Sequence, residues 1–532
     1  MYKFTLYLFI IFFARPACSQ VSRVWVSDNG NGSYTNPVIH ADYSDPDVVR
    51  VKDDYYMVSS SFNNVPGLPI LHSKDLVNWT HIGHALKKLV PDSHFRFVQH
   101  GGGVWAPSIR YYDNQFYIYY PDPDFGIYLI TSKLITGPWS DPVLVESGKG
   151  LIDPCPLWDN GKVYLVHAYA GSRAGFKSIL VIKELNTEGT KVTKDGVMVY
   201  DGHTQDPTIE GPKLHKKNNY YYIFAPAGGV STGWQLVLRS KNIYGPYERK
   251  VVMSQGNTTI NGPHQGAWIN TPTGEDWFVH FQDKEAFGRV VHLQPMKWIN
   301  DWPAIGVDVK GNGEGEPQIN YKKPAVKINL VKTVPDTDEF NVPTLGLQWQ
   351  WPANPQQGWA FPTALGFLRL NAFRISDSIK SYWNMPAMLL QKFPAANFTA
   401  TARVSLHPAF VNDRVGLILF GSDYSFISLV KKSDGLYITS NTSLHADKNN
   451  IETEVVLKKV ASNNIYFRIH VNDSARCTMS YSEDGTAFIK APGEFQTKPG
   501  RWVGARIGFF CTGTAKTNDA GFADLDWIRF TK

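Results

Sequence analysis

Three acidic residues in the first half of the chain stand at corresponding places of a repeated pattern. Asp45 and Asp153 each precede a proline, and Glu210 is followed by Gly211-Pro212. Hydrolysis of a glycosidic bond needs two carboxyl groups, one to protonate the leaving oxygen and one to activate water or attack the anomeric carbon. A third acid can keep the general acid protonated through like-charge repulsion. The three residues therefore fit the three roles of a glycosidase site, although an Asp before Pro can also simply start a turn.

Five aromatic segments recur downstream of these acids and of two further positions. They are DYYMVS at 54–59, QFYIYY at 115–120, KVYLVH at 162–167, YYYIFA at 220–225 and DWFVHF at 276–281. Their central aromatic residues are roughly 47 to 61 positions apart, near the period of propeller blades with four strands each. Because the inner strands of a propeller line its axis, we expect Asp45, Asp153, Glu210 and His264 to meet there.

The pattern along the chain predicts an all-β protein with two domains. Residues 34–309 carry the repeats and are predicted to form a five-bladed β-propeller. Residues 310–336 are polar and rich in Gly, Lys and Pro, which indicates a linker. Residues 337–532 contain short alternating strands, such as ATARVSL at Ala400 and IYFRIHVN at Ile465, which predict a β-sandwich. Helical periodicity is nearly absent.

The N-terminal residues have the composition of a signal peptide. Residues 1–19 contain Lys3, an apolar run from Leu6 to Ala14 and a small-residue exit before the mature chain. We expect an exported protein, periplasmic or secreted, with no transmembrane span. Lipid attachment at Cys18 is the less favoured alternative, because Arg15-Pro16 precedes that cysteine.

Composition narrows the class of partner. The net charge of +6 comes from 53 basic and 47 acidic residues without long basic runs, which argues against nucleic acid. Beyond Cys18 the chain has only Cys155, Cys477 and Cys511, so no disulfide framework is expected; the last two could pair or remain buried thiols. The aromatic content of 14% suits stacking on the sugar rings of an oligosaccharide or polysaccharide, although β-cores also use aromatic residues.

Longer segments around the acids resemble family 43 of the glycoside hydrolases. The segments are NPVIHADYSDPDVVRVKDDYYMVSSSF, GVWAPSIRYYDNQFYIYY, LIDPCPLWDNGKVYLVH, TIEGPKLHKKNNYYYIF and GRVVHLQPMKW. The C-terminal part, with DEFNVPTLGLQWQW and GARIGFF, is similar to the concanavalin-like sandwich, a jelly roll, of β-xylosidase-type members. The resemblance implies a five-bladed propeller followed by this sandwich.

The resemblance also assigns the three acids. It implies that Asp45 is the general base, that Glu210 is the general acid, and that Asp153 orients the acid and tunes its pKa. It further implies an inverting mechanism, in which the acid and base carboxyl groups lie roughly 6.5 to 9.5 Å apart with water between them. Asp42 and Asp47, on either side of the base, are expected to be solvated or to form turns.

Four more residues match positions of the family. Arg289 is expected to contact the hydroxyls of the terminal sugar, or else to balance the charge of the acids. Phe62 and Trp105 resemble the aromatic walls of the same subsite, with core packing as the competing interpretation. His264 corresponds to a histidine near the axis that touches water or a calcium ion, or it is a satisfied core histidine. No cofactor is expected to be required, and calcium at the axis remains open.

The expected activity is the release of terminal α-L-arabinofuranose or β-D-xylose from hemicellulose-derived saccharides. In similar proteins the sandwich packs on the propeller and narrows the pocket, which favours action on chain ends. SDPD stands at 44–47 where PDPS is more frequent; the change keeps Asp45 and places subsite shape in question. The alternatives are another terminal sugar, as in galactan or fructan, and a non-catalytic carbohydrate-binding protein, which should have lost at least one acid.

Overall fold

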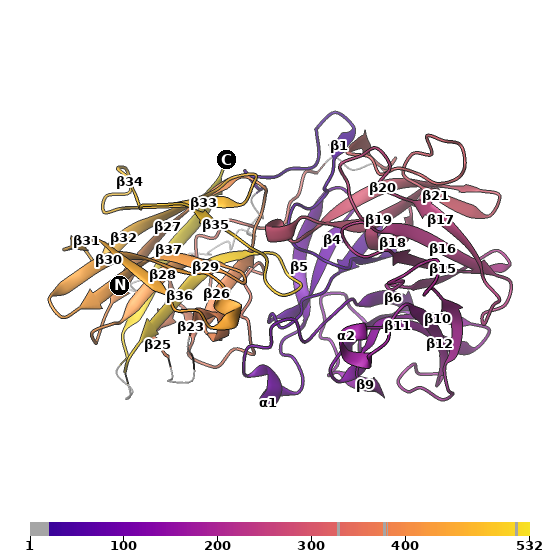
Figure 1. Cartoon of the computed structure of the whole chain (residues 1–532), viewed down its shortest axis with the longest axis horizontal. Coiled ribbons are helices and arrows are strands. Elements are labelled where there is room, and N and C mark those ends of the chain that lie inside the picture. The colour runs from indigo at the N-terminus through magenta and orange to yellow at the C-terminus, as the bar shows by residue number, and fades with distance from the viewer. Residues whose placement is uncertain (1–20, 327–329, 376–378, 380, 516–519) are drawn as a thin grey trace, which may run out of the picture.

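The computed structural model describes residues 21–326, 330–375, 379, 381–515 and 520–532. Two β-rich bodies lie side by side along the long axis, with the propeller formed by the first part of the chain and the sandwich by the last part (Figure 1). The predicted signal peptide, residues 1–19, and Cys18 lie outside the described residues. Within the described residues, no helix has the length and apolar character needed to cross a bilayer.

The first body is a five-bladed propeller, which confirms the prediction. Each blade is an antiparallel sheet of four strands that follow one another in the chain. The first two blades contain β2 (Asp47–Val51), β3 (Asp54–Val58), β4 (Gly67–Ser73) and β5 (Trp79–Leu86), then β6 (Ser108–Tyr112), β7 (Gln115–Asp122), β8 (Gly126–Ser132) and β9 (Val143–Ser147). The third contains β10 (Leu151–Asp159), β11 (Lys162–Tyr169), β12 (Ile179–Leu185) and β13 (Val197–Asp201). The last two contain β14 (Lys213–Lys217), β15 (Tyr220–Ala227), β16 (Trp234–Ser240) and β17 (Glu248–Met253), then β18 (His264–Asn270), β19 (Asp276–Asp283), β20 (Arg289–Ile299) and β21 (Trp302–Ile305).

The five aromatic segments are the second strands of the blades, and their composition follows from where they lie. Each of these strands is covered on both faces by neighbouring blades. In β7, Ile118 packs in the cluster shared with the first blade, whereas the next residue, Tyr119, packs in the cluster shared with the third. In β15, Ile223 and Phe224 divide in the same way between the third and fifth blades. Large apolar side chains are therefore needed on both faces, which removes the polar alternation of half-exposed strands.

The N-terminal segment closes the ring of blades. Ile39 exchanges two backbone hydrogen bonds with Val291 of β20, at 3.3 and 3.0 Å. Upstream, β1 (Ser33–Thr35) pairs with β22 (Asn320–Lys322), so the polar stretch predicted as a linker includes a strand bound to the propeller. The first and fifth blades thus share one apolar cluster and are joined by residues that precede the first blade.

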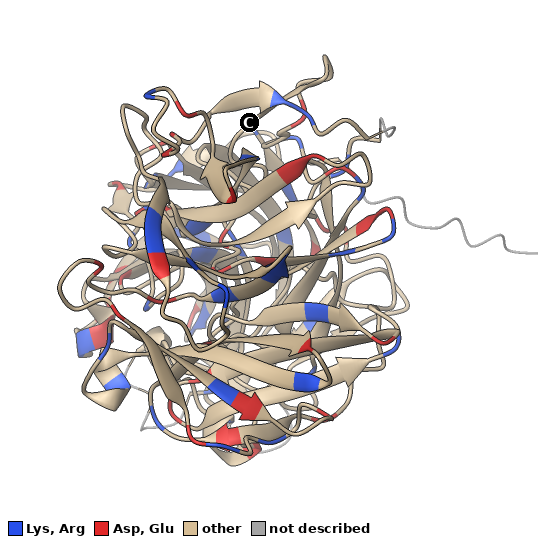
Figure 2. Cartoon of the chain, turned by 90° about the vertical axis from the view of Figure 1, so that its right-hand side faces the viewer, with Lys and Arg blue, Asp and Glu red and all other residues tan. Residues whose placement is uncertain are grey.

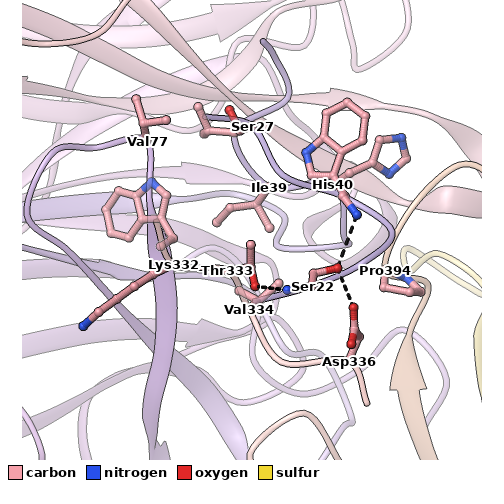
Figure 3. Close-up of a pocket in the computed structure, with 13 residues that line it drawn as sticks. Ser22, Ser27, Ile39, His40, Val77, Lys332, Thr333, Val334, Asp336 and Pro394 are labelled. Atoms are coloured by element: carbon pink, nitrogen blue, oxygen red, sulfur yellow. Dashed lines mark hydrogen bonds between the residues drawn. The ribbon is translucent and has the colours of Figure 1, made fainter. Parts of the chain in front are cut away.

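A small pocket lies where the N-terminal segment meets the segment before the sandwich (Figure 3). The backbone N–H of Ser22 donates to Thr333 Oγ1 at 2.8 Å, and the Ser22 hydroxyl donates to Asp336 Oδ2. Asp336 is the only carboxylate that lines this pocket, and burial raises its pKa. These two hydrogen bonds fasten the N-terminal segment to the segment before the sandwich.

The C-terminal body is a sandwich of two sheets around one large apolar core, and their strands are antiparallel except that β25 runs parallel to β36. One sheet contains, in order, β23 (Ala360–Pro362), β24 (Leu368–Asn371), β37 (Phe522–Thr531), β27 (Phe398–His407), β32 (Asn464–Val471), β33 (Arg476–Ser482) and β34 (Ile489–Lys490), with β35 (Phe495–Gln496) also beside β33. The other contains β25 (Phe373–Arg374), β36 (Arg506–Gly513), β28 (Arg414–Phe420), β29 (Tyr424–Lys432), β30 (Gly435–Ser443) and β31 (Thr453–Val460), with β26 (Met388–Lys392) also beside β36. The predicted strands at Ala400 and Ile465 are β27 and β32.

Helices are confined to single turns in the described part of the chain. They are α1 (Asp92–Phe95), α2 (Gly171–Ala174), η1 (Glu285–Phe287), η2 (Tyr382–Asn384) and η3 (Ala446–Lys448). Cys155, Cys477 and Cys511 are buried free thiols, so the pairing of the last two that the sequence left open does not occur. Figure 2 shows basic and acidic residues interspersed over the propeller side of the molecule rather than gathered by sign.

Candidate active site

All seven residues singled out from the sequence line one pocket on the propeller. Its volume, mouth included, is about 550 Å³, within the range of roughly 300–1,000 Å³ typical of small-ligand sites. The lining comprises Asp45, Phe62, Trp105, Ala106, Ile152, Asp153, Glu210, Val230, His264, Gln265, Arg289 and Trp502. Each of the five blades contributes a residue on its innermost strand or just before it, and the sandwich contributes Trp502. Phe62 and Val230 lie between the second and third strands of their blades, and Arg289 begins β20.

The three acids do not all occupy the same position of the repeat. Asp45 and Asp153 are equivalent to each other, whereas Glu210 lies one residue earlier in its blade. Asp45 and Asp153 have left-handed backbones, with φ of 55° and 58°. In the fourth and fifth blades the left-handed residues are Gly211 at 58° and Gln265 at 33°. Glu210 and His264 therefore stand one residue earlier than the equivalents of Asp45 and Asp153. The shift brings Glu210 into the pocket from a different direction, so that all three carboxyl groups can face one space.

Asp45 is held by a hydroxyl and a guanidinium. It is 5% exposed and lies in the turn that leads into β2. The Ser60 hydroxyl donates to its Oδ2, and Arg289 Nη1 lies 3.4 and 3.5 Å from its two oxygens. These contacts fix the orientation of the Asp45 carboxyl group at the wall of the pocket.

Asp153 and Glu210 form a close pair of acids in which Asp153 is the more deeply buried. Asp153 Oδ2 accepts the backbone N–H of Gly211 at 2.7 Å, and its Oδ1 lies 3.4 Å from Gln265 Nε2. Burial, followed by the negative charge of Glu210, raises the pKa of Asp153 to about 7. The Glu210 side chain is 32% exposed and reaches the open part of the pocket. The pair therefore retains one proton up to near neutral pH.

His264 is a partner of Glu210 rather than a ligand of an oxygen-rich site. Its Nε2 lies 3.0 Å from Glu210 Oε1, and its Nδ1 has no hydrogen-bond partner among the described residues. In the part of the chain that the structure describes, no group of three or more His, Cys, Asp and Glu residues is arranged to hold a metal ion. Calcium prefers several oxygen ligands, so the described residues around His264 do not fit a dedicated calcium site.

Arg289, Phe62 and Trp105 lie where the sequence placed them, on the walls of the pocket. The Arg289 guanidinium is centred 4.9 Å from the Phe281 ring and is mostly buried. The rings of Phe62 and Trp105 meet edge to face with centroids 6.1 Å apart. Trp105 Nε1 donates to Gly101 O at 2.9 Å, which fixes the ring. Both aromatic residues are therefore pocket walls that also pack against each other.

Three residues with polar or aromatic contacts at the site, Gln265, Ser60 and Trp502, were not singled out from the sequence. Gln265 follows His264 directly, and its left-handed backbone marks the position that Asp45 and Asp153 occupy. Ser60 supports Asp45 from the end of the first aromatic segment. Trp502 comes from the sandwich, and its ring centroid lies 6.0 Å from that of Trp105. No pattern in the sequence indicates the contact between Trp502 and Trp105.

The prediction for the two flanking acids was wrong. Asp47 is fully buried and accepts the backbone N–H of Ile109 at 2.8 Å and Arg110 Nη1 at 2.7 Å. It joins the first blade to the second. Asp42 is also buried, at 4% exposure, and is bonded to the backbones of both domains. Both are structural carboxylates, because the inner ends of the blades leave little solvent around them.

Neutralising Asp153 should stabilise the fold at alkaline pH. Because its pKa is raised to about 7 in the folded protein from an ordinary 3.8, its contribution to stability is complete below pH 4 and is lost as the pH rises through 7. Asp153→Asn should therefore raise the Tm at pH 8 by about 2–4 °C while changing it little at pH 4. Thermal unfolding at the two pH values checks this. An equal or lower Tm of the variant at pH 8 would show that the ionised Asp153 carboxylate does not destabilise the fold.

Comparisons with known proteins agree with this architecture. The model described as "Glycosyl hydrolases family 43" matches residues 34–303, and "Beta xylosidase C-terminal Concanavalin A-like domain" matches residues 337–531. A "Putative beta-xylosidase" of Xylanibacter ruminicola is 36% identical over 94% of this chain and 90% of its own length. A non-reducing end alpha-L-arabinofuranosidase of Bacteroides ovatus is 29% identical over 94% of both chains. The structure of a xylan beta-1,4-xylosidase from Bacillus halodurans, 23% identical, shares the fold over 94% of this chain and all of its own, with a TM-score of 0.82.

Proposed function

Because this chain belongs to family 43 of the glycosyl hydrolases, we propose that it removes one terminal pentose at a time from hemicellulose-derived saccharides. The pentose is β-D-xylose or α-L-arabinofuranose, the sugars named for the relatives in Xylanibacter and Bacteroides. The observation that carries this proposal is the meeting of Asp45, Asp153 and Glu210 in one pocket.

In this mechanism Asp45 is the general base and Glu210 the general acid. Asp45, held in place by Ser60 and Arg289, takes a proton from a water molecule as the water attacks the anomeric carbon. Glu210 gives its proton to the glycosidic oxygen as the bond to the leaving sugar breaks. Attack and departure occur on opposite faces, so the anomeric configuration inverts and no covalent sugar–enzyme species forms.

Asp153 orients the general acid. Its Oδ2 accepts the backbone N–H of Gly211, the residue after Glu210, and its Oδ1 lies 3.4 Å from Gln265 Nε2. The two carboxyl groups lie close together in a buried place, so a negative charge on both at once is unfavourable. The Glu210 side chain reaches the open pocket, where it can meet the leaving oxygen.

Arg289 and the aromatic walls recognise the terminal sugar. The Arg289 guanidinium is held between Asp45 and the Phe281 ring, so several of its fixed donors can face hydroxyl groups of a bound ring. Phe62 and Trp105 offer flat apolar surfaces to the C–H faces of the sugar. These contacts place the anomeric carbon near Asp45, and orientation of this kind supplies a large part of a rate enhancement.

The sandwich restricts the pocket to chain ends. The rings of Trp502 and Trp105 pack edge to face, with centroids 6.0 Å apart, and both line the pocket. A pocket bounded by two domains admits the end of a saccharide more readily than the middle of a long chain. We therefore place the leaving part of the substrate near Trp502.

Two further expectations from the sequence stay proposals. Export through a signal peptide over residues 1–19, to the periplasm or the medium, concerns residues outside the described part, as does the less favoured lipid anchor at Cys18. A calcium ion near His264 would need ligands other than a protein carboxylate cluster.

Side-by-side hydrolysis of aryl β-D-xyloside, aryl α-L-arabinofuranoside and short xylo-oligosaccharides with and without arabinose tests the proposal. Release of one terminal pentose from at least one natural oligosaccharide is the expected result. The aryl glycoside that is hydrolysed faster identifies the preferred terminal sugar. Inactivity on the whole panel, with a folded protein, would contradict the proposal and would favour another terminal sugar or a binding function.

A further inference from the structure

A buried carboxylate outside the three acids, Asp42, connects two walls of the pocket that belong to different domains. Its Oδ1 accepts the backbone N–H of Arg289 at 2.9 Å, and its Oδ2 accepts the backbone N–H of Gly504 at 2.9 Å. Arg289 is the residue that pairs with Asp45, and Gly504 follows Trp502 by two positions in the sandwich. One side chain thus holds both the propeller wall and the loop that bears the aromatic wall of the sandwich.

The two backbones meet at this point without space for a side chain. A Cβ atom on Gly504 would lie 2.7 Å from Gly288 Cα, and a Cβ on Gly288 would lie 2.5 Å from the Asp42 side chain. Ala505 also donates its backbone N–H to Ala286 O at 2.7 Å. Contacts this close leave the Trp502 loop little freedom to move relative to Arg289.

Asp42 also affects the pKa values of two buried basic side chains at the contact between the domains, Arg506 and Lys392. Burial lowers the pKa of Arg506 to about 10 and the nearby Asp42 charge opposes that shift. Among the described residues, Arg506 Nε and Nη2 have no hydrogen-bond partner, although Nη1 donates to Gln350 Oε1 at 3.1 Å. Burial, and then the charge of Arg506, lowers the pKa of Lys392 to about 7, again opposed by Asp42. Asp42 is therefore the anion that offsets two buried cations at the domain junction.

We propose that Asp42 is a positioning residue that sets the distance between Arg289 and Trp502, and with it the fit of the sugar that leaves. It touches none of the reacting atoms. The proposal rests on the proposed function for its kinetic consequence, while its structural consequence can be measured independently of any activity.

The structural test is amide hydrogen exchange of Asp42→Asn. An asparagine can accept only one of the two N–H groups, so exchange in segments 286–290 and 500–506 should accelerate by about tenfold or more. Asp413→Asn controls for the substitution itself. Asp413 is also fully buried, in the loop before β28, but it accepts the backbone N–H groups of Ala409 and Phe410 on the same oxygen, Oδ2. The amide oxygen of the variant can keep both bonds, so the control should leave exchange in the two test segments unchanged.

The kinetic test compares KM with kcat. Since the three acids are untouched, Asp42→Asn should raise KM for an oligosaccharide by about tenfold, with a smaller change in kcat. For an aryl glycoside, whose leaving group is a single ring, the rise in KM should be smaller. In Trp502→Ala the effect of adding Asp42→Asn should shrink, because part of it acts through Trp502.

The possible results distinguish a failure of the role proposed for Asp42 from a failure of the proposed glycosidase function. Unchanged amide exchange in both segments would overturn the role of Asp42. So would a double variant in which the fold-changes in KM of Asp42→Asn and Trp502→Ala simply multiply. If Asp42→Asn does not fold, Gly504→Ala disturbs the same contact from the other side and should give the same exchange and KM pattern. If the wild-type protein hydrolyses no glycoside, the proposed function fails, while accelerated exchange of the two segments would still support the connection.

Discussion

Glu210→Gln should lower kcat for a natural oligosaccharide by about 10³-fold, within the range of roughly 10²–10⁴ typical of general acid–base catalysis. A sugar is a poor leaving group and needs the proton that glutamine cannot give. The same variant should lose much less activity on an aryl glycoside whose phenolate leaves without protonation. The amide can still meet His264 Nε2, 3.0 Å from Glu210 Oε1 in the wild type, so the local geometry is kept. Kinetics on both substrates check the assignment.

The pattern across the two substrates decides the role of Glu210. A large loss on the oligosaccharide with a small loss on the aryl glycoside is the signature of a missing acid. Equal losses on both substrates would contradict the assignment, because an acid acts only on the leaving group. Thermal unfolding of the variant controls for a general loss of structure.

Asp45→Asn should instead abolish turnover of both substrates, by about 10³-fold or more. Water must be activated whatever the leaving group, so a better phenolate does not rescue the variant. The amide still receives the Ser60 hydroxyl, but Arg289 loses its anionic partner. Single-turnover and steady-state rates on the oligosaccharide and the aryl glycoside measure the loss.

A matched variant distinguishes chemistry from stability. Asp75→Asn makes the same change at another buried aspartate of the first blade, which accepts the backbone N–H groups of Val77 and Asn78 outside the pocket. It should lower the Tm and leave kcat near that of the wild type. Activity of Asp45→Asn within tenfold of the wild type would rule out Asp45 as the base.

The sequence predicted the fold well because its strongest signals are local and repeated. The second strand of every blade is buried on both faces, so its aromatic composition recurs and marks the blades. The acids could be found because each lies near the start of an inner strand, beside Pro or Gly. The one-residue offset, by which Gly211 and not Glu210 corresponds to Asp45, was missed. The spacing to the aligned tyrosine, 11 residues from Asp45 and Asp153 but 12 from Glu210, already contains it.

Contacts between the domains could not be predicted in the same way. Trp502 and Trp105 lie close in space but far apart in the chain, and neither segment has a pattern that refers to the other. Asp42 looked like a solvated neighbour of the base because its two partners, Arg289 and Gly504, offer only backbone N–H groups. Every residue except proline has a backbone N–H group, so the sequence does not show which residue will be the partner.

Proton NMR during hydrolysis of a xylo-oligosaccharide, and of its arabinofuranosyl-substituted form, shows the anomeric configuration of the first sugar released and so distinguishes a base at Asp45 from a nucleophile. We expect a single terminal pentose that appears first in the inverted configuration, α-xylose from a β-xyloside or β-arabinofuranose from an α-arabinofuranoside. Initial release of the retained anomer would contradict this expectation, because Asp45 would then have acted as a nucleophile on the sugar and not as a base on water.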